Sequence, residues 1–76
     1  MEVLMPKLGL TMSEGTLTAW LVADGGGVTV GQAICEIETD KVTHEILAEG
    51  DGVLRQLVPV GAVVAAGGVM GHVDVP

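Results

Sequence analysis

The chain has 76 residues, ten acidic and three basic, so its formal net charge is −7 with both histidines neutral. Trp20 is the only aromatic side chain in a sequence that is 49% hydrophobic, so the apolar mass is almost entirely aliphatic. This length predicts one domain, which we place at residues 1–76. The acidic balance argues against nucleic acids and anionic membranes as partners, because both require a basic surface.

Cysteine content and hydropathy exclude further classes. The single Cys35 cannot form an internal disulfide, and the chain has too few thiols and imidazoles for a structural zinc site, so we expect no metal. The uncharged stretch 56–73 contains Pro59 and several glycines, which argues against a membrane-spanning helix. The acidic start of the chain does not resemble a secretory signal, and a free thiol favours a reducing compartment.

Short runs of Val, Ile, Leu and Thr alternate with clusters of Gly, Asp and Pro, a pattern typical of many short strands. No window keeps a helical apolar stripe free of glycine. Strands at this spacing in a small chain predict a sandwich or a flattened barrel. The predicted strands are Glu2–Met5, Gly15–Val22, Val28–Val30, Ala33–Glu38, Val42–Leu47, Val53–Val58, Val63–Val64 and Val69–Val73.

The sequence also contains an internal repeat. Residues 15–22 align with residues 52–59, and residues 30–37 align with residues 66–73. Each half has fewer than 40 residues and could not bury a core alone, so we expect the two halves to pack together. The halves join in a predicted hairpin whose turn contains Asp40 and Lys41, at the opposite end of the molecule from the termini.

The hairpin turn carries one of only two lysines in the chain. We interpret Lys7, which follows a proline, as an ordinary exposed charge. Lys41 could be a solvated turn residue too, but the turn presents its amine away from the body. Nearby carboxylates would keep that amine protonated, which disfavours a nucleophile and suits a lysine modified by another enzyme. These carboxylates belong to Glu36, Glu38, Asp40 and Glu45.

Several motifs together resemble the lipoyl domain of the acyltransferase (E2) component of 2-oxo acid dehydrogenase complexes. The resemblance implies an all-β flattened barrel or sandwich hybrid of two four-stranded antiparallel sheets with pseudo-twofold symmetry. It also implies lipoic acid in amide linkage to Lys41, with Asp40 and Val42 flanking it as residues that the attaching enzyme recognises. The matching residues are 5–15, Trp20, Leu21, Gly31, 36–42, 52–54, Val60 and Gly61.

The resemblance further implies a monomeric, non-catalytic carrier that presents a swinging arm. Its partners would be the E1 decarboxylase, the E2 acyltransferase core, the E3 dihydrolipoamide dehydrogenase and a lipoate-attaching enzyme. The opening motif is more similar to pyruvate- or acetoin-type enzymes than to 2-oxoglutarate-type ones. The expected location is the bacterial cytoplasm or the mitochondrial matrix. By analogy with the family, a loop close to Lys41 would help partners recognise the domain; it comprises Leu8, Gly9, Leu10, Thr11, Met12, Ser13 and Glu14.

Four other kinds of protein fit this sequence less well. A biotin carrier domain would have methionine on both sides of the lysine, where this chain has Asp40 and Val42. A glycine-cleavage H-protein would be longer and would contain helices. An unmodified adaptor would not need the Asp-Lys-Val turn, and an acyltransferase would need a His-x-x-x-Asp-Gly motif that the chain lacks. His44 departs from the family's usual aliphatic residue, and alternation with Val42 and Ile46 predicts a partly buried neutral imidazole.

Overall fold

The computed structural model describes residues 1–40 and 42–75, and every regular element in these ranges is a strand. All eight predicted strands are present, with ends shifted by up to two residues. Within the described ranges, no helix is long and apolar enough to cross a membrane. The strands are β1 (Glu2–Leu4), β2 (Glu14–Trp20), β3 (Gly27–Val28), β4 (Ala33–Thr39), β5 (Val42–Leu47), β6 (Gly52–Gln56), β7 (Val63–Ala65) and β8 (Val69–Asp74).

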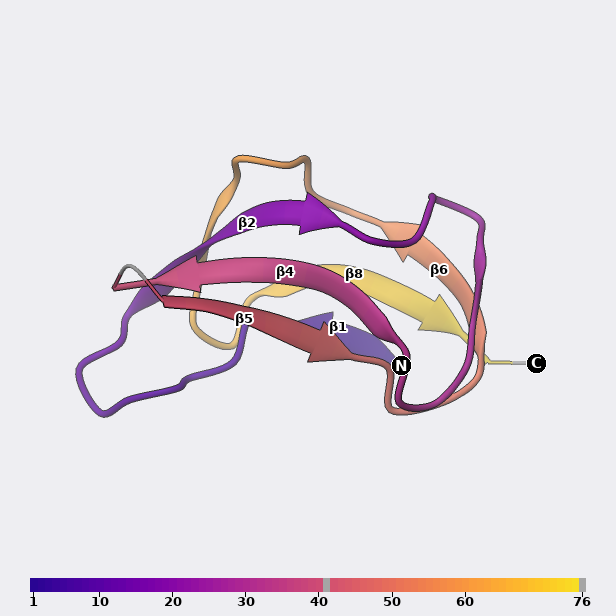
Figure 1. Cartoon of the computed structure of the whole chain (residues 1–76), viewed down its shortest axis with the longest axis horizontal. Coiled ribbons are helices and arrows are strands. Elements are labelled where there is room, and N and C mark those ends of the chain that lie inside the picture. Colours follow the sequence, from indigo (N-terminus) through magenta and orange to yellow (C-terminus); the bar gives the residue numbers. More distant parts are fainter. Residues whose placement is uncertain (41, 76) are drawn as a thin grey trace.

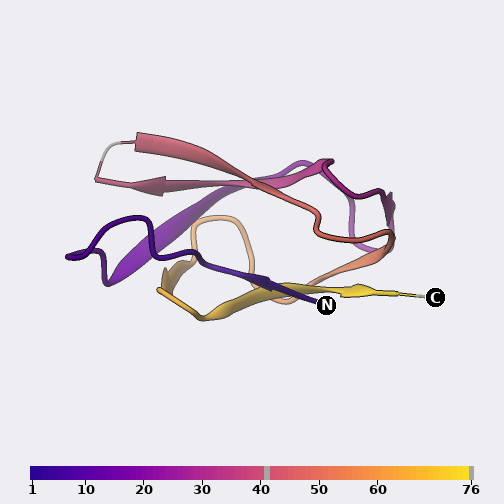
Figure 2. The ribbon, with the colours of Figure 1, turned by 90° about the horizontal axis from the view of Figure 1, so that it is seen from below.

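The strands form two antiparallel four-stranded sheets, ordered β1-β8-β6-β3 and β5-β4-β2-β7. Figure 2 shows them as two stacked layers. The predicted fold class is confirmed. Of the two predicted forms, the structure is a sandwich and not a closed barrel, because no ladder between described residues joins the two sheets.

The predicted repeat is confirmed by the sheet topology. Exchanging the two halves of the chain exchanges β1 with β5, β2 with β6, β3 with β7 and β4 with β8, and this turns one strand order into the other. Hydrogen bonds outside the ladders obey the same symmetry. The Gly25 amide donates to the Leu54 carbonyl at 2.7 Å, and the equivalent Gly61 amide donates to the Leu17 carbonyl at 2.7 Å. Both glycines have a positive φ, of 83° and 95°, which favours glycine at these turns.

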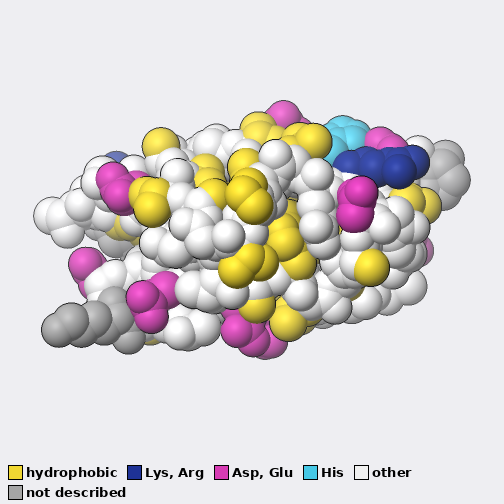
Figure 3. Space-filling view, turned by 90° about the horizontal axis from the view of Figure 1, so that it is seen from above, with side chains coloured by type: hydrophobic (Ala, Val, Ile, Leu, Met, Phe, Trp, Pro, Cys, Tyr) yellow, Lys and Arg dark blue, Asp and Glu magenta, His cyan; other side chains and the backbone are white. Residues whose placement is uncertain are grey.

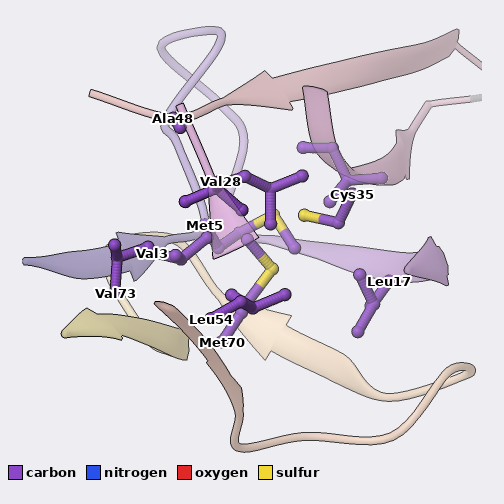
Figure 4. Close-up of a cluster of buried hydrophobic side chains, with 11 residues drawn as sticks. Val3, Met5, Leu17, Val28, Cys35, Ala48, Leu54, Met70 and Val73 are labelled. Carbon is purple, nitrogen blue, oxygen red and sulfur yellow. The ribbon is translucent and has the colours of Figure 1, made fainter. Parts of the chain in front are cut away.

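Symmetry-related side chains also fill the core. Leu17 and Leu54 occupy equivalent positions in the two halves, as do Ile37 and Val73, and all four are fully buried. Figure 4 shows side chains from both sheets pointing toward one another in this cluster. Cys35 is buried among them. The remaining buried apolar residues are Val3, Met5, Val28, Ile34, Ala48 and Met70.

The molecule is elongated, with extents of 36 × 21 × 17 Å. In Figure 1 the end of β4 and the start of β5 lie at the left, while the labels of both chain termini lie at the right. The loop between β1 and β2 reaches the same left end as the β4–β5 hairpin. The architecture therefore gathers one hairpin and one loop far from the points where a longer chain would enter and leave.

Candidate functional site

The β4–β5 hairpin is the centre of the candidate site. Thr39 of β4 pairs with Val42 of β5, so only positions 40 and 41 connect the two strands. Asp40 has a φ of 45°, the left-handed conformation that two-residue hairpin turns require and that Asp tolerates better than most residues. Lys41, the predicted attachment residue, lies outside the described residues. Its two neighbours are both exposed, Val42 to 51%.

The loop between β1 and β2 lies beside this hairpin, as the analogy with the family predicted. The two segments enclose a shallow hollow of about 300 Å³. Two contacts within the loop keep it compact: the Leu8 amide lies 3.2 Å from the Met12 sulfur, and the Met12 amide donates to the Gly9 carbonyl at 3.2 Å. The hollow is lined by Leu8, Gly9, Thr11, Met12, Thr39, Asp40, Val42 and His44.

Three predicted loop residues lie elsewhere. Leu10 is 96% exposed and is the most exposed of the large apolar side chains in the described ranges. Ser13 accepts a hydrogen bond from the Ala66 amide through its carbonyl, at 2.9 Å. Glu14 belongs to β2 and pairs with Ala65 of β7, so the strand begins one residue earlier than predicted. Part of the loop therefore faces the hairpin, while Leu10 faces solvent.

The sequence did not single out Thr39 and His44 as lining residues. His44 pairs with Ile37 across the β4–β5 ladder and is half-buried, as the alternation along β5 predicted. Thr39 and His44 line the hollow because the loop between β1 and β2 folds back onto the hairpin. No local sequence pattern predicts the path of that loop. Among the described His, Cys, Asp and Glu residues, no group of three is arranged to hold a metal ion.

Acidic side chains surround the hairpin. Glu36 of β4 is directly opposite Glu45 of β5 on the outer face of the sheet, and Glu38 lies two positions along β4 on the same face. Between described residues, Arg55 of β6 forms an ion pair with Asp74 of β8 at 3.1 Å, and the His72 imidazole contacts the same carboxylate at 3.2 Å. On the face drawn in Figure 3, acidic side chains are scattered among apolar ones. The carboxylates around the hairpin thus have no basic partner among the described residues.

Comparisons with known proteins place this geometry in a family. A family model described as "Biotin-requiring enzyme" matches residues 1–73. The solution structure of the lipoyl domain of the 2-oxoglutarate dehydrogenase complex from Azotobacter vinelandii superimposes with a TM-score of 0.79 at 32% identity. The match covers 96% of this chain and 94% of that domain. This chain belongs to the lipoyl-domain family.

Curated relatives of this lipoyl domain are much longer proteins. The acetyltransferase component of the acetoin cleaving system of Cupriavidus necator is 48% identical over 56 residues, which are 74% of this chain and 15% of that protein. The pyruvate dehydrogenase E1 component subunit beta of Rhizobium meliloti is 49% identical over 57 residues, 75% of this chain and 12% of that protein. The lipoyl domain thus corresponds to about one eighth to one seventh of the length of these relatives.

Proposed function

We propose that this lipoyl domain carries lipoic acid in amide linkage to Lys41 and presents it to the enzymes of a 2-oxo acid dehydrogenase complex. The observation that carries the proposal is the two-residue connection between Thr39 and Val42, at the end of the molecule away from the termini. A side chain attached there can enter a partner's active site while the termini remain tethered elsewhere. When bound, the lipoyl dithiolane accepts an acyl group and two electrons.

The residues of the hairpin fit such a group. Asp40 holds the turn in its left-handed conformation, and exposed Val42 leaves the neighbouring position accessible to an attaching enzyme. Amide formation would remove one positive charge and change the formal charge of the chain from −7 to −8. The domain itself would remain a non-catalytic carrier, with the acyltransferase activity supplied by another part of the parent protein.

Recognition by partner enzymes would use the loop beside the hairpin. Leu10 is exposed at the end of the molecule that would approach a partner's active site. An exposed apolar side chain at this position suits a contact that becomes buried when the partner docks. The relatives named for acetoin cleavage and for pyruvate dehydrogenase support a pyruvate- or acetoin-type complex. The partners would be E1, the E2 core, E3 and a lipoate-attaching enzyme.

Reductive acylation tests the carrier function. The lipoylated domain is mixed with a pyruvate-specific E1 and pyruvate, and in parallel with a 2-oxoglutarate-specific E1 and its substrate. Intact mass then reports acyl transfer. We expect acylation with the pyruvate system, none of the Lys41→Ala variant, and a lower kcat/KM for Leu10→Ser without loss of folding. A lipoylated domain that no E1 acylates would contradict the proposal.

The choice between lipoyl and biotin is tested at the residues beside Lys41. We expect the double variant Asp40→Met, Val42→Met to accept biotin from biotin protein ligase, and the unaltered domain to refuse it. Biotinylation of the unaltered domain would instead assign this chain to biotin-dependent enzymes, which the family description also covers.

A further inference from the structure

A second, larger hollow continues from the one at the hairpin. It has a volume of about 770 Å³ and lies between β1 and β5, which are edge strands of different sheets. Figure 2 looks onto this side, with β5 in the upper layer and β1 in the lower. Leu8 and His44 line both hollows, so the two hollows adjoin. Together they extend from the residues on either side of the β4–β5 turn along β5, and we call them the furrow.

We propose that the lipoyl arm lies in this furrow between its visits to partner active sites, an inference that rests on the proposed attachment to Lys41. The furrow begins at the attachment point, because both chain neighbours of Lys41, Asp40 and Val42, line the first hollow. From Val42 to Ile46 the furrow follows β5 over four residue-to-residue steps, about 13 Å at the usual rise of a strand. An extended lipoyl-lysine side chain has a comparable length.

The chemistry of the lining matches a hydrocarbon arm that ends in sulfur. Leu8, Met12 and Val42 provide apolar contacts near the hairpin, and Ile46 continues them along β5. Leu8 is 48% exposed in the unmodified domain, so a resting arm would cover apolar surface that otherwise faces water. Met12 supplies a polarizable thioether of the kind that adapts to irregular partners.

Charge favours the arm over a second copy of this chain. Glu2, Glu45 and Glu49 are among the residues around the larger hollow, which has no Lys or Arg among its lining residues. Two copies would bring net charges of −7 together at an acidic rim. The lipoyl group is neutral once its amide has formed, so the acidic residues do not repel it. It is also covalently attached to the domain whose furrow it would occupy.

Methyl NMR spectra of three forms of the domain test this inference: unmodified, lipoylated at Lys41, and carrying acetyl-lysine at position 41. Acetyl-lysine has the same amide and charge but lacks the chain. We expect lipoylation, and not acetylation, to shift the methyl resonances of Leu8, Met12 and Ile46. We expect the methyl resonances of Val53 and Val63, which lie on other strands, to stay unchanged in both modified forms. Intact mass establishes in each sample that the group is attached.

A chemical readout uses a matched pair of loop variants. The rate at which a water-soluble phosphine reduces the lipoyl disulfide is measured for Leu8→Asp and for Leu10→Asp, which differ in that only Leu8 lines the furrow. An arm that spends half of its time covered reacts about twofold more slowly than a free one. We therefore expect Leu8→Asp to raise the rate by about twofold, and Leu10→Asp to leave it unchanged.

The possible results separate this inference from the proposed function. A lipoylated domain whose shifts match those of the acetylated one would overturn the resting arm and leave the carrier function intact. Shifts that depend on protein concentration would show that a second copy covers the furrow, which also overturns it. Absence of lipoylation in the mass spectrum would overturn both proposals together.

Discussion

The backbone of Asp40 determines the shape of the hairpin turn. Its φ of 45° lies in the left-handed region, which costs an L-residue about 1–2 kcal/mol. Asp tolerates this region better than most residues, and a β-branched residue tolerates it poorly. We expect Asp40→Val to lower the free energy of unfolding by about 1 kcal/mol and Asp40→Gly to leave it unchanged, both measured by urea denaturation. Equal losses in the two variants would show that the Asp side chain, and not its backbone conformation, stabilises the turn.

Burial of Cys35 links stability to pH. Burial raises the pKa of this thiol from 9.0 to about 11, so the folded state keeps a proton that the unfolded state releases. The stabilisation is complete below pH 9 and is lost as the pH rises toward 11, by on the order of 2 kcal/mol. We expect the free energy of unfolding to fall more steeply between pH 9 and 11 for the unaltered domain than for Cys35→Ala. Parallel pH profiles would contradict this account.

At the level of elements, local patterns predicted the strands well. Alternating Val, Ile and Thr bounded by glycine turns located all eight, and the repeat anticipated that the halves would share a core. Local patterns did not predict the contacts between segments that are distant in the sequence. The hydrophobic pattern around Leu8 says nothing of Thr39 or His44, because their contact depends on the path of a whole loop. The larger hollow likewise exists because β1 and β5 are edge strands of different sheets and do not pair with each other.

Gly52 shows how closely two strands approach in the sheet. A Cβ at this position would overlap the carbonyl oxygen of Asp74 on β8 and lie 3.0 Å from its carbonyl carbon, and this backbone cannot move without breaking the ladder. We expect Gly52→Ala to cost about 1–3 kcal/mol in thermal or urea unfolding. Gly9→Ala is the matched control, because nothing lies within 4 Å of its Cβ. An unaltered stability of Gly52→Ala would mean that β6 and β8 are less tightly paired than described.

The opposed carboxylates of β4 and β5 destabilise the sheet that bears the site. Glu36 and Glu45 are direct cross-strand partners, and like charges in this position repel. We expect Glu45→Lys to stabilise the domain by about 0.2–1 kcal/mol. Glu49→Lys changes the net charge equally without a ladder partner, so the difference between the two variants isolates the pair. The difference should shrink in 1 M salt, where the screening length is about 3 Å; a difference that salt does not alter would exclude electrostatic repulsion as its source.

At the scale of the whole molecule, symmetry and charge have separate consequences. Two halves too small to fold alone share one core, which places the β4–β5 hairpin at one end and the termini at the other. The equivalent strands of the other half-pair, β8 and β1, are the last and the first of the described strands, so they pair without a hairpin turn between them. The scarcity of basic residues then leaves two lysines, of which Lys7 lies exposed in the loop between β1 and β2.

The proposed carrier function requires that the folded domain be modified at Lys41. The most direct measurement is a peptide map with intact mass after incubation with lipoate–protein ligase, lipoate and ATP. We predict the addition of a single lipoyl group, found in the peptide that contains Lys41, and no addition to a folded Lys41→Ala variant. Addition at Lys7, or no addition to a domain shown to be folded, would contradict the account.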